Sequence, residues 1–333
     1  MFGKIIGTGS YVPKEIVTNK DLAQYLDTDD TWIRERTGVK SRHISGDNET
    51  TADMAVKAAE KALDNSGLLP DEIDLIIVSS VSSNLVLPST ACFVQKAINA
   101  KNAFCFDINV ACTGFITAYN ISQTFINTGL INTALVIGAE NLSKITDWSD
   151  RKTCILFGDG AGAVVIKKDE NAMFETVMFS NGEDGDALTM ENPFALRKTN
   201  LGKNHQGQFD ISFQDIQKTY INMDGGEIFK FAVKKVPECI EALLEKIHMD
   251  KDEIDKYLLH QANSRIIEGI AKRSKIPLKK IPLNIEDYGN VSSACIPMLL
   301  DKLKGLDEIK AGDKIIMAGF GAGLSYGATY LEF

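Results

Sequence analysis

The sequence lacks any apolar run of roughly 18 residues, the length that a transmembrane helix needs. The beginning of the chain, MFGKIIGTGSYVP, also lacks the apolar stretch of roughly 7–15 residues that marks a signal peptide. We therefore expect a cytoplasmic protein that has no membrane partner.

The chain has few histidines, no paired metal-ligand motif and no net positive charge. The chain has four histidines and no CxxC or HxxxH pair, so we expect no metal site. Its six cysteines lie in apolar or small-residue contexts, which favours reduced thiols over a disulfide framework. The net charge of −9 argues against nucleic acid as a partner, although a local basic patch is compatible with it.

The composition that is present is that of an ordinary globular protein, with 44% hydrophobic and 24% charged residues. Apolar runs alternate with helical patterns, which predicts an α/β fold. Helices are expected at 51–66, which Gly67 would end, and at 226–246, which Pro237 would kink or break. Residues 154–168 predict two strands around a glycine-rich turn.

The chain divides into three parts. Residues 1–170 and 223–333 carry the regular helix and strand patterns, whereas residues 171–222 are polar and poorly periodic. We interpret the middle part as a cap or excursion between two halves rather than as a separate domain.

A sequence pattern in the first half recurs in the second half. Glu72-Ile73-Asp74 precedes an apolar run, and Glu253-Ile254-Asp255 precedes another, at an offset of 181 positions. The same offset carries Cys112 onto Ser293, and each of these residues lies at the mouth of a predicted helix. Two half-copies of one unit explain the pattern economically, although a chance recurrence is the alternative.

Cys112, in DINVACTGF, is a candidate nucleophile because it lies where a predicted strand passes into a helix. The N–H groups at a helix N-terminus stabilise a thiolate and can also hold the oxyanion that forms when a thioester is attacked. The alternative is a buried structural cysteine, which is where most free cysteines are found.

Two further polar residues follow apolar segments. His260 ends a predicted strand and begins the polar cluster HQANSR, and Asn290 lies in YGNVSS. A histidine there could serve an active site and an asparagine amide could donate to a developing enolate, although a structural histidine and a simple turn are the alternatives. The glycine-dense segments 158–162 and 319–323 are neither a Walker A loop nor a good dinucleotide fingerprint, so close backbone approach explains them better.

Together these residues show a resemblance that covers essentially the whole chain. The sequence resembles the β-ketoacyl-acyl-carrier-protein synthase III family of condensing enzymes, which belongs to the thiolase-like superfamily. The motifs that carry the resemblance are GTGSYVP, DTWIRERTGVKSRH (30–43), ACTGF (111–115), FGDGAGA (157–163), HQAN (260–263), YGNVSSACIP (288–297) and GFGAG (319–323). The resemblance implies a duplicated thiolase-like α/β fold with five layers, α-β-α-β-α, and two mixed β-sheets; the nucleophile would lie in the half 1–170.

The resemblance also implies the reaction. Cys112 would take an acyl group from an acyl-CoA primer and pass it to malonyl-acyl-carrier protein by a ping-pong decarboxylative Claisen condensation that initiates fatty-acid biosynthesis. The backbone N–H groups of Cys112 and Ala322 would hold the oxyanion, and His260 and Asn290 would stabilise the enolate. No metal or other cofactor is implied, whereas a homodimer and an acyl-carrier-protein partner are.

Other site residues follow from the same resemblance. The expected CoA contacts are Trp32, Arg36, Arg151 and Asn263. Leu87, reached across a dimer interface, and Phe320 are expected at the acyl pocket. Docking of the carrier protein is expected on Lys230, Arg265, Lys272 and Arg273, although these residues could instead form an ordinary solvated face.

The departures from the family keep alternatives open. Leu87 stands where many members have phenylalanine, and residues 181–222 look about ten residues longer than the usual connection. A primer somewhat larger than acetyl is compatible with both departures, as is a related acyltransferase or condensing enzyme of specialised metabolism. A non-catalytic acyl-binding protein on the same fold is disfavoured by the intact cysteine, histidine and asparagine.

Overall fold

The computed structural model describes residues 1–192, 199–203, 206, 209–213 and 219–333. The first of its two large sheets is built from the first half of the chain. β4 pairs in parallel with β5 and β6, whereas β7 pairs antiparallel with β1 and β6, so the sheet is mixed. In spatial order its strands are β1 (Phe2–Tyr11), β7 (Asp159–Asp169), β6 (Thr133–Asn141), β4 (Leu75–Ser79) and β5 (Phe104–Ile108).

The second sheet is also mixed and has four strands. β13 and β14 run parallel, while β15 pairs antiparallel with both β14 and β8. In spatial order the strands are β13 (Lys256–Leu259), β14 (Lys314–Gly321), β15 (Ser325–Glu332) and β8 (Phe174–Ser180). β8 comes from residues 171–222, so the segment expected to be a cap begins with a strand of this sheet.

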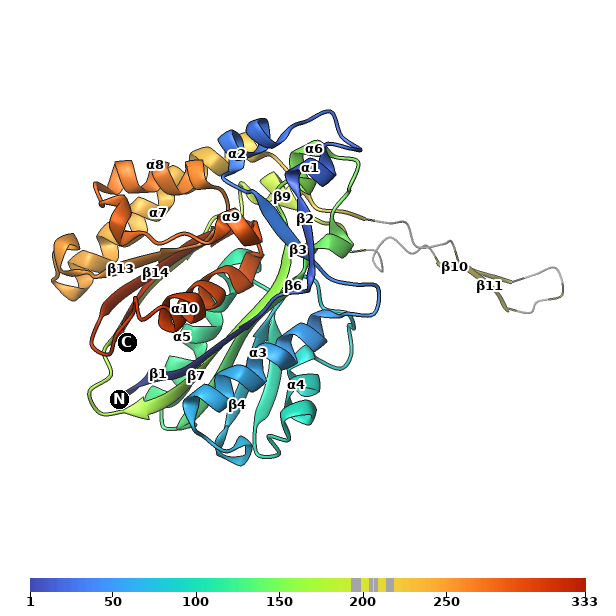
Figure 1. Cartoon of the computed structure of the whole chain (residues 1–333). Coiled ribbons are helices and arrows are strands. Elements are labelled where there is room, and N and C mark those ends of the chain that lie inside the picture. Colours follow the sequence, from blue (N-terminus) through green and yellow to red (C-terminus); the bar gives the residue numbers. More distant parts are fainter. Residues whose placement is uncertain (193–198, 204–205, 207–208, 214–218) are drawn as a thin grey trace.

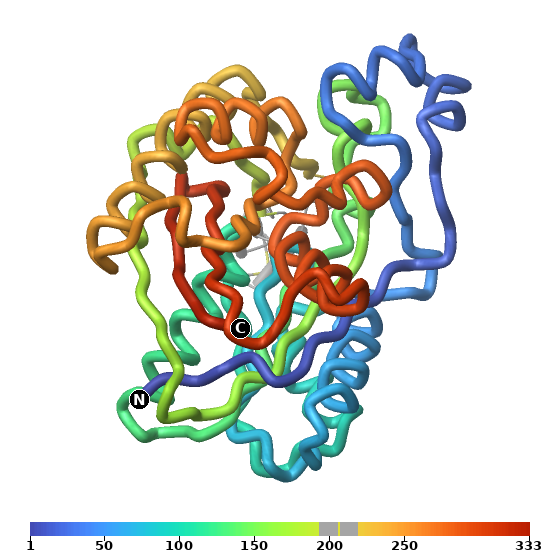
Figure 2. Tube along the Cα trace, turned by 60° about the vertical axis from the view of Figure 1, so that its left-hand side comes forward, coloured from blue at the N-terminus to red at the C-terminus, as the bar shows by residue number. Residues whose placement is uncertain are grey.

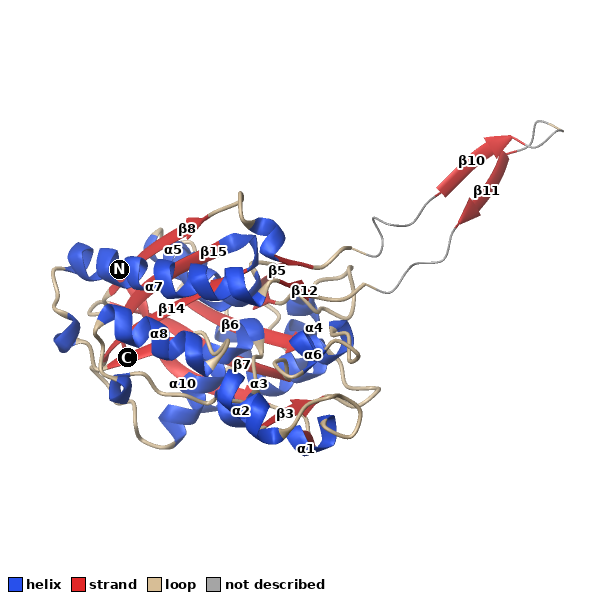
Figure 3. Cartoon of the chain, turned by 90° about the horizontal axis from the view of Figure 1, so that it is seen from above, coloured by secondary structure: helices blue, strands red, loops and turns tan. Residues whose placement is uncertain are grey.

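Helices fill the space between the sheets and cover their outer faces (Figures 1 and 3). The buried helices α5 and α10 lie between the sheets, and their apolar side chains share one cluster with strands of both. α3 and α4 pack on the first sheet, and α7 and α8 pack on the second. The bounds of these helices are α3 (Thr51–Ser66), α4 (Thr90–Ile98), α5 (Gly114–Asn127), α7 (Gly225–Ile247), α8 (Ser264–Ser274) and α10 (Cys295–Gly305). The five-layered α-β-α-β-α arrangement is confirmed.

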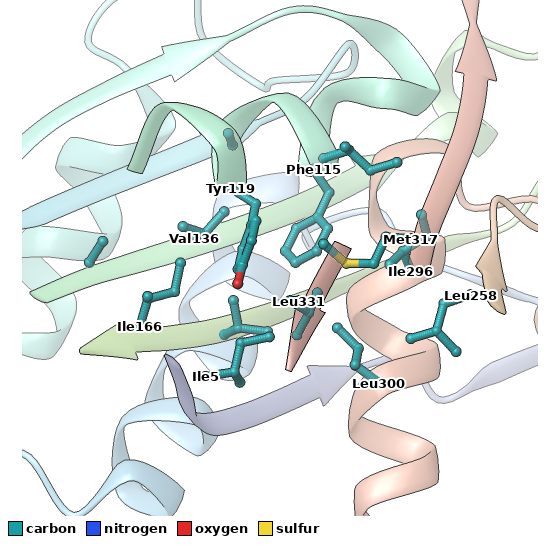
Figure 4. Packing of buried hydrophobic residues seen from close by; sticks show 14 of the residues in the cluster. Ile5, Phe115, Tyr119, Val136, Ile166, Leu258, Ile296, Leu300, Met317 and Leu331 are labelled. Atoms are coloured by element: carbon teal, nitrogen blue, oxygen red, sulfur yellow. The ribbon is translucent and has the colours of Figure 1, made fainter. Parts of the chain in front are cut away.

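The central layer forms the core that holds the two halves together (Figure 4). Phe115 and Tyr119 of α5 and Leu300 of α10 pack between Ile5 of the first sheet and Leu331 of the second. All five side chains are buried, and burial of large apolar side chains is the main force that stabilises such a layer.

The helix predicted over residues 51–66 is confirmed. α3 begins after Thr50, whose side chain and that of Asp53 form a capping box, and it ends at Gly67 in the left-handed conformation. In the ranges that the structure describes, no helix has the length and hydropathy needed to cross a membrane.

Two local predictions are wrong. Residues 154–168 contain one strand and not two: a short turn after α6 (Arg151–Cys154) leads into β7 (Asp159–Asp169), and Gly162 within β7 marks the close approach of α10 and not a turn. A Cβ at Gly162 would lie 2.5 Å from the backbone nitrogen of Met298. α7 continues through Pro237, whose missing N–H is outweighed by the buried face that α7 packs on the second sheet.

The offset of 181 positions between the two halves also relates their structural elements. β4 starts at Leu75 and β13 at Lys256, an offset of 181 positions, and the starts of α5 and α10 have the same offset. Both helices follow a 3₁₀ turn whose first residue has a positive φ of 45°, Ala111 in one and Ser292 in the other. The halves therefore share a local backbone design and not only an order of elements.

Smaller elements frame one end of the layers. The early lobe (residues 12–45) extends from the layered body in Figure 2, and its buried side chains Leu22 and Ile33 pack against residues 154–157. The hairpin of β10 and β11 lies away from the layered body in Figures 1 and 3. These elements are β2 (Glu15–Thr18), α1 (Asn19–Leu22), α2 (Asp30–Thr37), β3 (Ser41–Ile44), β9 (Leu188–Thr189), β10 (Thr199–Lys203), β11 (Phe209–Phe213), β12 (Asn222–Met223) and α9 (Ile285–Tyr288).

Candidate active site

One cavity of about 1470 Å³ brings the three candidate reactive residues together. Its walls include Cys112, His260 and Asn290, along with Phe320 and Ala322. These residues come from the ends of strands and the starts of helices in both halves, which is where an α/β sheet collects functional groups.

Cys112 occupies the 3₁₀ turn Ala111–Thr113 that leads into α5. Its position at a helix N-terminus favours the thiolate. Burial acts more strongly and raises the pKa of the thiol to about 12, an effect that the Ser292 hydroxyl partly offsets. The resting thiol is therefore protonated, and acylation requires that its proton be taken up.

The backbone of β14 passes very close to Cys112. A Cβ built on Gly321 would lie 2.8 Å from the Cys112 backbone nitrogen, so a side chain there would displace the nucleophile. Ala322 follows immediately and lines the same cavity. This explains the glycines of GFGAG as a close backbone approach, which is the interpretation that the sequence favoured.

His260 follows β13 and is buried. Burial lowers the pKa of its imidazole to about 3, so the ring is neutral at physiological pH. It lies edge-on to Phe320 with the ring centroids 5.5 Å apart. Nδ1 has no hydrogen-bond partner in the described part of the chain. A neutral ring can donate one hydrogen bond to a substrate oxygen without carrying a charge.

Asn290 is held by its own backbone and loop. Its N–H donates to Leu156 O over 2.8 Å, and its carbonyl accepts from Gly158 N over 3.1 Å. The side-chain Oδ1 accepts the backbone N–H of Ser292 at 2.8 Å, which leaves the amide NH₂ as the group for a ligand in the cavity. An amide fixed in this way can donate to an oxygen but cannot take a proton.

Three of the expected CoA contacts lie against one another. The guanidinium carbons of Arg36 and Arg151 are 4.7 and 4.8 Å from the centroid of the Trp32 ring. Arg36 lines the cavity, as does Asn263, whose amide donates to Arg36 O and whose Oδ1 accepts from Arg265 N. These residues therefore form one aromatic and cationic group at the mouth of the cavity.

The two residues expected at the acyl pocket lie in different surroundings in the single chain. Phe320 is buried and lines the cavity, whereas Leu87 is 83% exposed and is not among the residues that line it. Sequence reasoning missed most of the apolar wall of the cavity, including Leu142, Leu156 and Phe157. Phe157 could have been noticed because it opens the motif FGDGAGA, in which only the glycines were considered.

The expected docking residues for a carrier protein lie on two packed helices. Lys230 is on α7, and Arg265, Lys272 and Arg273 are on α8. All four are exposed, and Lys230 and Arg265 also line the cavity. Lys230 is paired with Glu227 at 2.7 Å, so part of its charge is already compensated.

Sequence reasoning also missed a buried carboxyl beside the nucleophile. Glu140, at the end of β6, is fully buried, and its charge acts on Cys112. The signal was an acidic residue at the end of the wholly apolar run TALVIGA. No group of three or more metal-ligating side chains that could hold a metal ion occurs within the residues described.

A cysteine at a helix mouth that shares a cavity with a neutral histidine and an asparagine, on a duplicated fold of two mixed sheets, defines a thiolase-like condensing enzyme. Family models support the same class: residues 106–185 match 3-oxoacyl-[acyl-carrier-protein (ACP)] synthase III, and residues 244–333 match its C-terminal part. The chain belongs to the β-ketoacyl-acyl-carrier-protein synthase III family, whose members are acyltransferases that initiate fatty-acid synthesis.

Full-length relatives agree with this assignment. The chain is 45% identical to a β-ketoacyl-[acyl-carrier-protein] synthase III of Clostridium acetobutylicum, over 99% of this chain and 98% of the relative. Among solved structures, the 3-oxoacyl-[acyl-carrier-protein] synthase III of Aquifex aeolicus is 41% identical with a TM-score of 0.88, covering 99% of this chain and 100% of that one. The priming β-ketosynthase of the R1128 polyketide pathway is 32% identical with a TM-score of 0.89, covering 100% and 96%.

Proposed function

We propose that the chain condenses an acyl-CoA primer with malonyl-acyl-carrier protein through an acyl-Cys112 intermediate and so initiates fatty-acid biosynthesis. The observation that carries this proposal is the single cavity lined by Cys112, His260 and Asn290. Residues 1–170 act as the half that bears the nucleophile, and residues 223–333 as the half that bears the histidine and the asparagine.

In the first half-reaction, the Cys112 sulfur attacks the primer thioester and CoA leaves. The backbone N–H groups of Cys112 and Ala322 hold the oxyanion that forms. This role is supported by the close approach of β14 to Cys112 and by the place of Ala322 in the cavity wall.

In the second half-reaction, His260 and the Asn290 amide donate hydrogen bonds to the malonyl thioester oxygen. Loss of CO₂ then leaves an enolate that these donors stabilise, and its carbon attacks the acyl-Cys112 carbonyl. The neutral imidazole supports this role, because a ring whose pKa is about 3 acts as a hydrogen-bond donor without first gaining a charge.

Substrate recognition is assigned to two groups of residues. Trp32, Arg36, Arg151 and Asn263 bind CoA; the cation–π group that the first three form supports stacking near the adenine. Arg265, Lys272 and Arg273, with Lys230 at the cavity mouth, dock an acidic carrier protein in the cytoplasm; a local basic face on a chain of net charge −9 supports this role.

The acyl pocket is assigned to Phe320 of one chain and Leu87 of its partner in a homodimer. The high exposure of Leu87 in the single chain supports a place at such an interface. Leucine in place of a phenylalanine leaves room for a primer somewhat larger than acetyl. A priming role in specialised metabolism is the second candidate, favoured by the likeness to the R1128 priming β-ketosynthase.

The test is intact-protein mass spectrometry after mixing with a panel of acyl-CoAs, followed by malonyl-acyl-carrier protein. We expect an acyl adduct on the wild type and none on Cys112→Ala, and we expect the carrier to discharge it as a β-ketoacyl product. The His260→Ala variant should still take up the acyl group on Cys112 but fail to transfer it to the malonyl carrier, with the condensation rate reduced by about 10²-fold or more. Loading without discharge in the wild type would favour the second candidate, and no loading by any acyl-CoA would reject both.

A further inference from the structure

The buried carboxyl of Glu140 has no role in the chemistry described above, although it lies beside the nucleophile. Its Oε2 accepts from Ser82 Oγ at 2.6 Å, Val81 N at 3.1 Å and Ser80 Oγ at 3.3 Å. Its Oε1 accepts from Ser293 Oγ at 2.8 Å. Four donors of this kind fit an ionised carboxylate, and none of the ion pairs found in the described residues includes Glu140.

One hydroxyl, that of Ser292, lies near both this carboxyl and Cys112, and it lines the same cavity as Cys112. Ser292 Oγ is buried and has no partner of standard hydrogen-bond geometry in the part of the chain described. It nevertheless lies close enough to the thiol of Cys112 and to the carboxyl of Glu140 to lower the pKa of each and so favour its charged form. A buried hydroxyl without a fixed partner is unusual, and here it has two titratable neighbours.

The other titratable side chains near Cys112 are either uncharged at neutral pH or hydrogen-bonded elsewhere. His260 is neutral, and burial lowers its imidazole pKa to about 3. Burial raises the pKa of the Cys295 thiol, on α10, well above its usual range. Asp107, on β5, accepts the backbone N–H groups of Thr90 and Ala91 instead. Burial raises the pKa of Glu140 from its usual value, which makes this carboxylate a stronger base than an exposed one.

We propose that Glu140 is a positioning residue that acts through Ser292 and takes up the proton of Cys112 during acylation. The inference rests on the proposed function, in which Cys112 attacks an acyl-CoA thioester. It follows from a buried carboxylate, an uncommitted hydroxyl and a nucleophilic thiol that lie next to one another.

The proton transfer balances in both directions. As the Cys112 sulfur forms its bond to the acyl carbon, the S–H proton passes to Ser292 Oγ while the Ser292 proton passes to Glu140. When the C–S bond to CoA breaks, the proton returns through Ser292 to the leaving CoA thiolate. The carboxylate is then ionised again, and no other reactant is consumed.

The experiment compares how acylation depends on pH in variants that leave the backbone unchanged. Glu140→Gln removes the acceptor; with its amide flipped, the Gln oxygen still accepts the three bonds to Oε2 and its NH₂ donates to Ser293 Oγ. Ser292→Ala removes the connecting hydroxyl, and alanine is compatible with the backbone because Ala111 has the same φ of 45° in the other half. Ser293→Ala is the matched control, since that hydroxyl bonds Glu140 but does not act on Cys112.

Rates of Cys112 acylation by acyl-CoA and of its alkylation by iodoacetamide are measured from pH 6 to pH 9. If Glu140 accepts the Cys112 proton, the rates of acylation and alkylation of the wild type should not change with pH across neutrality. The Ser293→Ala variant should show the same flat profile. Glu140→Gln and Ser292→Ala must lose the proton to water, so their rates should rise about tenfold per pH unit and lie about 10²-fold lower near pH 7.

Three outcomes would overturn the proposal: a wild-type rate that itself rises tenfold per pH unit, a flat profile in Glu140→Gln, or the same change of slope in Ser293→Ala as in Ser292→Ala. Circular dichroism and a urea midpoint for each variant separate a folding defect from a change of slope. Alkylation needs no acyl-CoA recognition. It therefore tests the relay even if the wild type is not acylated, which would instead reject the proposed function.

Discussion

At the scale of single residues, burial of His260 in the active site makes the free energy of unfolding depend on pH. Its imidazole pKa is lowered from 6.5 to about 3 by burial, so between these values the unfolded chain binds a proton that the folded chain does not. Protonation therefore favours the unfolded chain at low pH. The contribution of His260 to the free energy of unfolding is highest above pH 6.5 and decreases as the pH falls, by about 1.4 kcal/mol at pH 5.5.

The measurement is urea unfolding of the wild type and His260→Asn at pH 7.5 and pH 5.5. The decrease in the free energy of unfolding between these pH values should be about 1.4 kcal/mol smaller in the variant. His248→Asn is the control, because this exposed histidine ends α7 in a left-handed conformation that asparagine also adopts. An equal decrease in all three proteins would contradict the lowered pKa.

Residues also differ in how far their roles can be predicted from sequence. Cys112 was a candidate because a strand, a thiol and a helix follow one another in the chain, and the structure has that order. Glu140 ends an apolar run in the sequence, but that signal does not show its place beside Cys112, and Ser292 gave no signal because it comes from the other half of the chain. Packing of the 3₁₀ turn before α10 against the 3₁₀ turn before α5 brings Ser292 to the nucleophile.

At the scale of elements, Arg42 ties the early lobe to the catalytic loops. This fully buried residue of β3 donates to Val17 O at 3.1 Å, to Asn19 Oδ1 at 3.0 Å and to Ile155 O at 2.8 Å. Residue 156, next along the chain, provides the carbonyl that accepts the backbone N–H of Asn290. The lobe and the asparagine are thus linked through one short segment.

Arg42→Lys should therefore destabilise the protein by about 2–4 kcal/mol, because a lysine cannot reach all three acceptors and its buried charge is left partly unpaired. The urea midpoint should fall without a change in slope. Arg34→Lys is the control: this partly exposed residue pairs with Asp30 within one turn of α2, so the change should be below about 0.5 kcal/mol. Equal effects at the two positions would show that burial of the guanidinium is not decisive.

Elements were predictable where a local pattern decides them. α3 has its apolar stripe, its capping box and its terminal glycine within one stretch of sequence. The errors at α7 and β7 have a common cause, since in both cases a distant element overrides a local signal. Pro237 lies within the buried face of α7 that packs on the second sheet, and the glycines of β7 admit α10. A single sequence does not show which distant element will approach.

At the scale of the whole molecule, the first sheet ends on one side in β5, whose surroundings expose apolar side chains. β5 is the outer strand, Phe104 on it is 65% exposed, and the neighbouring Leu85, Val86 and Leu87 are 45%, 72% and 83% exposed. An unpaired strand edge with exposed apolar side chains is a site for pairing with another strand. Antiparallel pairing of β5 with its copy would join two sheets into one and bury these side chains in a twofold interface.

Phe104→Asp tests this arrangement, because a twofold axis would bring two buried carboxylates together at the interface. We expect a dimer for the wild type and a monomer for the variant at micromolar concentration, measured by light scattering after size-exclusion chromatography. Phe179→Asp is the matched control: Phe179 is 47% exposed on β8, the free edge of the second sheet. A dimer that survives Phe104→Asp but not Phe179→Asp would move the interface to the second sheet, and Leu87 would then have no partner cavity to reach.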